Sequence, residues 1–366
     1  MQHLTQWINS QNSSALTKGM PFGLLSFDNA FLNYNLNSSS LNVFDQRTMV
    51  ARFQMNNSKP YRAETIRKQS INAHALMGLL GDQQLPLTAK SSGRGGGSSI
   101  AAAAADLHSS GKNGVAATSS SLPWAPPTAD TMAVASRNSK NQKQITVLVA
   151  TGGAIATASG TNVSVSVSVS GLGAVFAAGG HAAVFILGAP AANELWQAAG
   201  RPPYPSKALL AQMRDAQELA PVRIEQIAAA TSTSTAAAAA AAPSGAFKTE
   251  ISLPHDNGGV AVVHLCPKNA SPPSPVTGIA THAVGPGSTL ISWEHGTNCY
   301  YSTNPCVKTF AILDESMPTR GAKRLNAKDL IFTSWQLEGK LPAKISVIAI
   351  DYAGQASEPT FFFAGK

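Results

Sequence analysis

The chain has 366 residues, which is enough for two or three domains, and its hydrophobic content of 44% excludes a wholly disordered protein. Only 13% of the residues are charged, because long stretches consist of Ala, Gly, Ser and Thr. The 27 Lys and Arg residues exceed the 19 Asp and Glu residues and give a net charge of +8, but they form no basic run, so a nucleic-acid partner is not predicted.

Residues 1–88 have ordinary complexity and predict an α/β unit. The stretch LLSFDNAFLNY reads as a strand that runs into a loop, and residues 63–85 read as a helix with apolar positions at helical spacing. Residues 1–10 show no basic segment followed by an apolar one, so no signal peptide is expected in this chain.

Asp28 is the unusual feature of this unit, because it interrupts an otherwise apolar run. It stands at the C-terminal end of the predicted strand, where barrel enzymes place functional side chains; an Asx turn or a helix cap is the alternative interpretation. Arg47 is either a bidentate clamp for a carboxylate or diol, or a surface charge. Sugar hydrolysis usually needs two facing carboxyl groups, and neither Glu64 on the predicted helix nor Asp82 near its end is expected to face Asp28.

The middle of the chain changes from low complexity to β pattern. Residues 89–140 are rich in Gly, Ser and Ala and predict a disordered insertion, because they offer too little apolar surface to offset chain entropy. Residues 141–271 predict a β-sandwich, with strict alternation in NVSVSVSVS and a short helix at 206–219. A second disordered insertion is expected at about 228–246.

Strand patterns also account for the most apolar stretch and for the C-terminal part. Residues 171–192 are rich in Gly and Ala and lack basic flanks, so they predict buried strands and not a membrane span, and His181 among them reads as a core histidine. Residues 272–366 follow a Pro-rich hinge and contain short strands separated by turns, with Trp293 on an early strand. This pattern resembles a seven-stranded fibronectin type III module.

The three cysteines predict one disulfide and one free thiol, with the pairing open. Cys266, Cys299 and Cys306 fall within one 41-residue window and lack zinc-site spacing, and the eight histidines form no ligand cluster, so no metal or other cofactor is predicted. A disulfide points to an oxidising compartment. Potential glycosylation sites agree with this compartment, and they begin at Asn12, Asn37, Asn56, Asn162 and Asn269.

A second enzyme class is suggested by one short motif. QITVLVATGGAIA resembles the strand and Gly-rich turn of bacterial-type asparaginases, in which Thr151 would be the nucleophile, and EHGTN resembles their second motif. The second motif has Asn298 where an acidic residue is expected, and the intervening sequence shows no repeated α/β pattern. An asparaginase-like amidohydrolase is therefore a remote alternative, because short motifs recur by chance.

Several stretches, taken in order, resemble the α-L-iduronidases of glycoside hydrolase family 39. They cover most of the chain outside the two insertions and read FGLLSFDNAFLNY, FDQRTMVARFQMNNS, RKQSINAHALMGLLGDQQL, ELWQAAGRPPYP, VVHLCPKNASPPSPVTGI, CVKTFAIL and ISVIAIDYAGQASEP. The resemblance implies an α+β multidomain chain: a C-terminal remnant of a TIM (β/α)8 barrel at 1–88, then the β-sandwich, then the fibronectin type III-like domain.

The resemblance also implies roles for individual residues. Asp28 is similar to the family's substrate-contacting aspartate and Arg47 to an arginine of the same sugar site, although Phe27 replaces an Asn of the family's pattern. Asn56 matches a glycosylation site of the family, and Asn162 lies near another. Cys266 and Cys306 match cysteines that the family joins in a disulfide, whereas Cys299 has no counterpart.

The implied activity is retaining hydrolysis of terminal uronic acid residues in glycosaminoglycan-like polysaccharides, in a lysosome or vacuole or outside the cell. The family's two catalytic glutamates lie on the fourth and seventh barrel strands, which have no match in this sequence, so the chain alone is expected to be inactive. The alternative is a non-catalytic carbohydrate-binding or scaffold protein built on the two β-domains, against which a partial barrel with open sheet edges argues.

Overall fold

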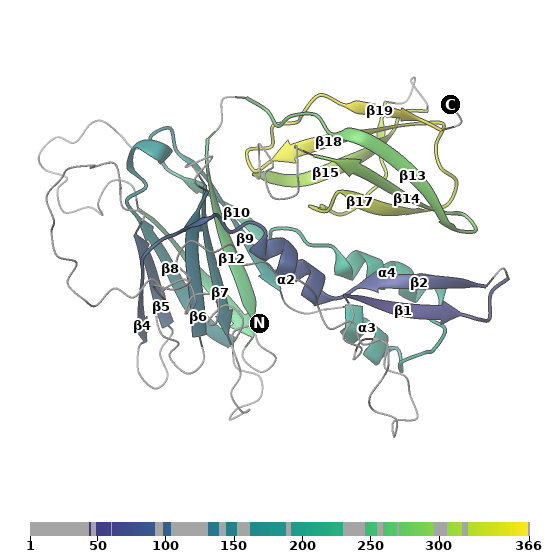
Figure 1. Ribbon diagram of the computed structural model, residues 1–366, viewed down its shortest axis with the longest axis horizontal. Coiled ribbons are helices and arrows are strands. Elements are labelled where there is room, and N and C mark those ends of the chain that lie inside the picture. Colours follow the sequence, from purple (N-terminus) through teal and green to yellow (C-terminus); the bar gives the residue numbers. More distant parts are fainter. Residues whose placement is uncertain are drawn as a thin grey trace, which may run out of the picture.

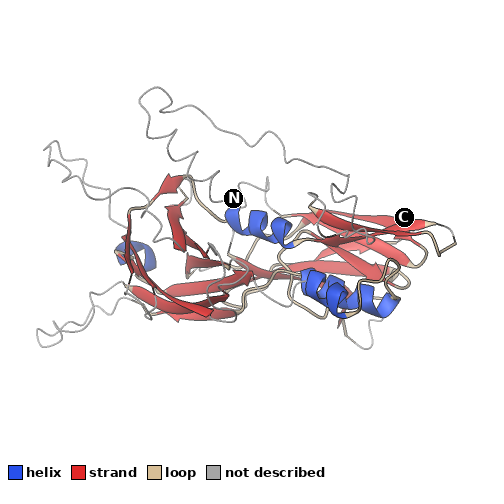
Figure 2. Ribbon diagram, turned by 90° about the horizontal axis from the view of Figure 1, so that it is seen from below, coloured by secondary structure: helices blue, strands red, loops and turns tan. Residues whose placement is uncertain are grey.

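The chain is mostly β in its described part. In Figure 1 the strands form two separate groups, and a hairpin lies with two helices beneath the second group; Figure 2 shows a helix between the groups. The structure is a computed structural model that describes residues 44, 49–59, 61–91, 98–103, 131–138, 144–151, 162–187, 192–229, 246–254, 259–268, 271–295, 306–316 and 321–364.

The first group consists of two facing sheets. One has six strands in the order β10-β9-β12-β7-β6-β3, and the other has four in the order β11-β8-β5-β4. The strands are β3 (Gln83–Gln84), β4 (Leu87–Ser91), β5 (Ser98–Ala103), β6 (Thr131–Arg137), β7 (Ile145–Thr151), β8 (Asn162–Ser170), β9 (Gly180–Leu187), β10 (Arg223–Ile227), β11 (Phe247–Pro254) and β12 (Val260–Pro267).

The alternating sequence NVSVSVSVS shows why these sheets face each other. Val165, Val167 and Val169 of β8 are all fully buried, whereas the intervening serines point to the other side of the sheet. The three valines share one core with residues of β7 and β12, such as Val147 and Val263. The period-two pattern therefore predicts correctly both the strand and the side of it that is buried.

Part of the stretch 89–140 is ordered, so the prediction of a wholly disordered insertion is wrong. β5 pairs in parallel with β8, and β6 pairs antiparallel with β7. Ala133 and Ala135 of β6 are buried in the core between the two sheets, because small side chains are enough where the facing sheet supplies the larger ones. The sheets of the first group thus begin before residue 141.

The most apolar stretch, 171–192, forms a short 3₁₀ helix, η1 (Gly173–Phe176), and the buried strand β9. β9 lies inside the six-stranded sheet between β10 and β12. This agrees with the expectation of buried strands. Within the described residues, no helix is both long and apolar enough to cross a membrane.

The second group also consists of two sheets around one core. Their orders are β13-β14-β17 and β16-β15-β18-β19, which makes seven strands. Trp293, Phe310, Ile291 and Val347 are core residues contributed by both sheets. The strands are β13 (Thr277–Gly285), β14 (Ser288–Glu294), β15 (Val307–Asp314), β16 (Lys323–Arg324), β17 (Ser334–Glu338), β18 (Lys344–Asp351) and β19 (Thr360–Phe363).

A β-hairpin stands where the sequence pattern predicts the start of a helix. β1 (Val50–Met55) pairs with β2 (Arg62–Arg67), and the helix α2 (Gln69–Met77) begins only afterwards. The inner face of the hairpin, with Phe53 and Ile66, packs on Trp196 and Met213 of the helices α3 (Ala192–Ala198) and α4 (Lys207–Gln217). Tertiary packing of β-branched Ile66 therefore outweighs the helical spacing of residues 63–67.

The alternation in β8 gives a direct test of the core between the two sheets of the first group. Val167→Ala should lower the free energy of unfolding by about 2 kcal/mol, because two buried methyl groups and their packing contacts are lost. Ser166→Ala, on the opposite side of the same strand, should change it by less than about 0.5 kcal/mol. Urea unfolding followed by circular dichroism measures both, and equal effects would contradict the assignment of faces.

Candidate functional site

The predicted sugar-binding residues are not part of the described structure. Asp28 and Arg47 lie outside the described residues, and so does Asn269. Asn56 lies in the exposed turn between β1 and β2, where the Ser58 hydroxyl of the same glycosylation triplet donates a hydrogen bond to Met55 O at 2.6 Å. Asn162 begins β8.

The structure corrects the position of Glu64. The sequence pattern predicts a helical residue, but Glu64 lies on β2 opposite Phe53, with 11% of its side chain exposed. Its carboxylate accepts from Arg62 Nε at 2.7 Å and from Arg214 Nη2 at 2.5 Å. Two arginines therefore neutralise a carboxylate that has little access to water.

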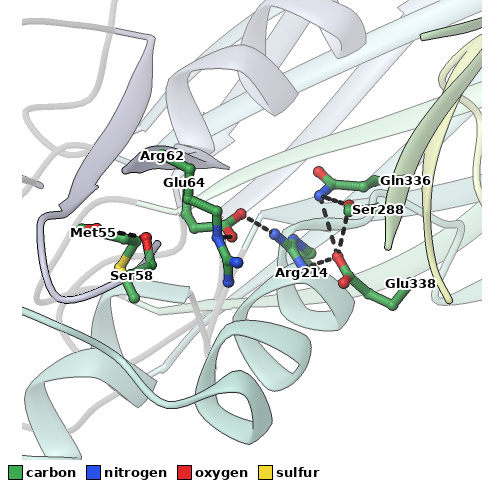
Figure 3. A network of polar contacts seen from close by, with 8 residues as sticks. All are labelled: Met55, Ser58, Arg62, Glu64, Arg214, Ser288, Gln336 and Glu338. Carbon is green, nitrogen blue, oxygen red and sulfur yellow. Dashed lines mark hydrogen bonds and ion pairs between the residues drawn. The ribbon is translucent and has the colours of Figure 1, made fainter. Parts of the chain in front are cut away.

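Arg214 of α4 is the centre of a polar network that joins three parts of the chain. Figure 3 shows it between Glu64 of β2 on one side and Glu338 of β17 on the other, and it forms an ion pair with each. Glu338 Oε1 also accepts from Ser288 Oγ and from Gln336 Nε2, each at 3.1 Å. The network links the hairpin, the helix that supports it and the second group of sheets.

The arrangement does not provide the chemistry of sugar hydrolysis. A glycosidase needs an open space between two carboxyl groups, one of them protonated. The Arg214 guanidinium, on a side chain that is 12% exposed, stands between Glu64 and Glu338 and pairs with both, so it fills the space that a substrate would need. Among the described residues this network is therefore a structural joint.

A second joint lies where β2 ends and α2 begins; we call it the Arg67–Glu218 joint, made of Arg67, Asn72, Gln217, Glu218 and Phe332. Arg67 Nη2 contacts Glu218 Oε1 at 2.5 Å, and the Arg67 guanidinium carbon lies 3.9 Å from the centre of the Phe332 ring. The Gln217 side chain accepts from the backbone N–H of Arg67 at 2.7 Å, and its backbone oxygen accepts from Asn72 Nδ2 at 3.1 Å. Burial raises the pKa of the Glu218 carboxyl, against the opposing effect of Arg67.

The Cys266–Cys306 disulfide is confirmed. It joins the end of β12 to the residue before β15, with Cα atoms 6.0 Å apart, and so connects the two groups of strands. Beside it, His264 is fully buried, and its Nδ1 is 2.8 Å from the hydroxyl oxygen of Tyr352. Burial lowers the pKa of His264 to about 4, so this imidazole is neutral in the folded protein at neutral pH.

Thr151 and His181, for which the sequence suggested roles, both lie on strands of the first group. The Thr151 hydroxyl, buried at the end of β7, accepts from Gly259 N at 2.8 Å, and this backbone contact argues against a free nucleophile. His181 lies half-buried on β9 rather than fully in the core. In the part of the chain that the structure describes, no group of three His, Cys, Asp or Glu side chains could hold a metal ion.

Comparison with known proteins shows which proteins this chain is similar to. No family model matches the chain. The alpha-L-iduronidase of Homo sapiens is 44% identical over 69 residues, or 19% of this chain and 10% of that protein. The alpha-L-iduronidase of Canis lupus familiaris is 25% identical over 353 residues, or 89% of this chain and 45% of that protein.

The chain is related to the alpha-L-iduronidases. The resemblance that the ordered stretches suggest is thereby confirmed. A solved structure described as the bacterial orthologue of human α-L-iduronidase covers 87% of this chain with a TM-score of 0.58; at 18% identity that likeness concerns the fold alone. The match covers 47% of that structure, so the chain spans less than half the length of the alpha-L-iduronidases it matches.

The two joints escaped prediction because their members are far apart in the sequence. Glu64 and Arg214 are separated by 150 residues, and Arg214 and Glu338 by 124. An isolated arginine on a helix such as α4 carries no sign of a distant partner. Only the two cysteines had a recognisable signal, through their match to the α-L-iduronidase pattern.

The Arg214 network predicts unequal roles for its two carboxylates. Glu64→Gln should lower the free energy of unfolding by about 3 kcal/mol, because it leaves two largely buried arginines short of a negative partner. Glu338→Gln should cost less than about 1 kcal/mol, since that side chain is 52% exposed. Chemical unfolding of both variants and of the double variant measures the difference, and similar losses would contradict the described network.

His264 predicts a loss of stability in acid. Its pKa is lowered on folding from 6.5 to about 4, so the stabilisation is complete above 6.5 and is lost as the pH falls. At about pH 4 the wild type should have lost about 3 kcal/mol more than His264→Gln. Urea unfolding over a pH series measures this, and a control variant of the exposed His282, His282→Gln, should behave as the wild type.

Proposed function

We propose that the chain is the C-terminal portion of an α-L-iduronidase-like glycoside hydrolase of family 39 that acts on terminal uronic acid residues of glycosaminoglycan-like polysaccharides. The observation that carries this proposal is the 353-residue similarity to the dog alpha-L-iduronidase, which extends through nearly the whole chain. The likeness of fold to the bacterial orthologue extends over a similar share of the chain.

In this proposal residues 1–88 complete a TIM barrel, residues 141–271 form the main part of a β-sandwich, and residues 272–366 form a fibronectin type III-like domain. The helix α2 supports the barrel assignment. Ala73 and Leu76 are buried in the described structure, while Ile71 and Ala75 are only partly covered. The helices of a barrel likewise pack their apolar positions against the sheet and against neighbouring elements.

Asp28 and Arg47 are proposed to bind the sugar. The Asp28 carboxylate would accept hydrogen bonds from sugar hydroxyls, and the Arg47 guanidinium would hold the uronic acid carboxylate through two parallel hydrogen bonds. Glycosylation is proposed at Asn56, Asn162 and Asn269; the exposed turn that holds Asn56 is accessible to such a modification. An oxidising, lysosomal, vacuolar or extracellular location agrees with the disulfide.

Catalysis by these residues alone is not proposed. The mechanism of the family needs a general acid and a nucleophile, and the stretches that match here do not include either glutamate. The purified 366-residue chain should therefore release no fluorophore from a fluorogenic iduronide. Turnover that Asp28→Asn abolishes would contradict this part of the proposal.

Binding tests the sugar site separately from catalysis. Titration of an oligosaccharide with a terminal iduronic acid, followed by calorimetry, should show binding that Asp28→Asn and Arg47→Gln each weaken by about tenfold, since each variant loses charged hydrogen bonds worth at least about 1.4 kcal/mol. Arg52→Gln, on an exposed position of β1, is the matched control and should leave binding unchanged. Binding that neither site variant alters would show that the site is assigned wrongly.

A further inference from the structure

The strand β19 presents two aromatic side chains to solvent. Phe361 and Phe363 are each 45% exposed, although phenylalanine is usually a core residue. Figure 1 shows β19 at the upper rim of the second group of strands, on the side away from the hairpin β1–β2. Exposed apolar side chains are ordinary where they stand singly, whereas two neighbouring rings on one strand indicate a surface that binds a partner.

The register of the sheet places both rings on its outer face. Phe362 lies between them in the sequence and packs against the core of the second group. Because side chains alternate along a strand, Phe361 and Phe363 point to the other side, where they lie opposite Ser346 and Lys344 of β18.

The strand that carries the two rings is held at both ends. Thr360 Oγ1 donates a hydrogen bond to Val276 O at 2.6 Å, and Ala364 N donates to Ala343 O at 3.0 Å. The rings therefore stand on a fixed backbone, and a ligand that packs on them would lose little affinity to the ordering of this strand.

A lysine completes the surface. Lys344 Nζ lies 4.1 Å from the centre of the Phe361 ring and 5.7 Å from the centre of the Phe363 ring. Lys344 forms no ion pair with a described carboxylate, and the carboxylate of Glu315, which is bonded to Lys344 through the backbone, accepts from Ser346 Oγ at 2.8 Å. The surface thus combines aromatic faces with an ammonium group that is available to an anion.

An acidic sugar matches both parts of this surface. One side of a pyranose ring consists of C–H groups that pack on the negatively polarised face of an aromatic ring, and a carboxylate at the edge of the sugar can pair with an ammonium. A second copy of this chain fits less well, because a two-fold contact through β19 would bring two Lys344 ammonium groups together.

We propose that Phe361, Phe363 and Lys344 form a second carbohydrate-binding surface, which takes an internal uronic acid residue of a glycosaminoglycan-like polysaccharide. The sugar packs on the two rings, and its carboxylate pairs with Lys344 Nζ. This inference rests on the proposed function for the class of polysaccharide and adds a contact outside the site of Asp28 and Arg47. Contacts at two places along one polymer strengthen its binding through effective concentration.

Titration calorimetry of the full chain with a sulfated pentasaccharide tests the proposal. The pentasaccharide alternates N-acetylgalactosamine with iduronic acid and has N-acetylgalactosamine at both ends, so it offers no terminal iduronic acid to the site of Asp28 and Arg47. Phe361→Ala and Phe363→Ala should each weaken its binding by at least about threefold, because each removes one aromatic face. Lys344→Gln should weaken binding by about threefold and make it less dependent on salt.

Two controls make the result specific. Tyr204→Ala removes an aromatic side chain of similar exposure, 43%, from the segment between α3 and α4, and it should leave binding of the pentasaccharide unchanged. A pentasaccharide without sulfate and with reduced carboxyl groups should bind the wild type about as weakly as the charged one binds Lys344→Gln. Circular dichroism should show that the variants keep their fold, since both rings lie outside the core.

Equal binding of the charged pentasaccharide to the wild type and to the three surface variants would overturn the proposal. Equal binding of the charged and neutral pentasaccharides to the wild type would overturn it as well. A dimer in sedimentation analysis that Phe361→Ala dissociates would show that a second copy occupies the surface instead. Failure of the proposed function is a different result, because it would appear as the absence of Asp28-dependent binding of a terminal iduronic acid.

Discussion

The two groups of strands are held together by one apolar cluster, and the polar contacts between them depend on it. This junction cluster includes Leu76 of α2, Phe185 of β9, Tyr352 after β18 and the half-cystines Cys266 and Cys306. Burial of apolar surface is favourable in any orientation, so the cluster alone does not fix one geometry. The disulfide limits how far the groups can separate, and the contact between His264 of β12 and Tyr352 after β18 fixes their relative position at a further point.

The two arginine–carboxylate joints beside this cluster differ in the number of donors that each carboxylate receives. Arg62 contacts one carboxylate oxygen of Glu64 and Arg214 contacts the other, so both oxygens have a charged partner. Glu218 receives Arg67 on one oxygen only, and the other remains without a donor. The first joint therefore holds its carboxylate through both oxygens, whereas the ion pair of the second joint uses one.

In the proposed function, the described residues support a sugar site and do not form it. Their buried charges are neutralised by partners within the protein, which stabilises one arrangement of hairpin, helices and sheets. The relationship to the alpha-L-iduronidases agrees with such a role, because the proposed sugar ligand Arg47 shortly precedes the hairpin β1–β2 in the sequence and Asp28 lies further before it. A firmly held hairpin would fix the C-terminal end of the segment that carries the proposed sugar ligands.

The sequence by itself determined the elements whose pattern is local. Alternation in β8, continuous apolar runs in β7 and β9, and the helix α4 were all predicted correctly, because side-chain spacing within one segment decides which face is buried. The relationship to the alpha-L-iduronidases, and with it the pairing of Cys266 and Cys306, was also predicted from the sequence, through ordered matches spread along the chain. The tertiary structure alone decided that residues 62–67 form a strand, that small residues of β6 join a sheet, and that Arg214 meets Glu64 and Glu338. The ion pairs of Arg214 join segments more than 100 residues apart, and local patterns hold no information about such partners. The place of β6 depends on its pairing with β7 and on the core between the two sheets.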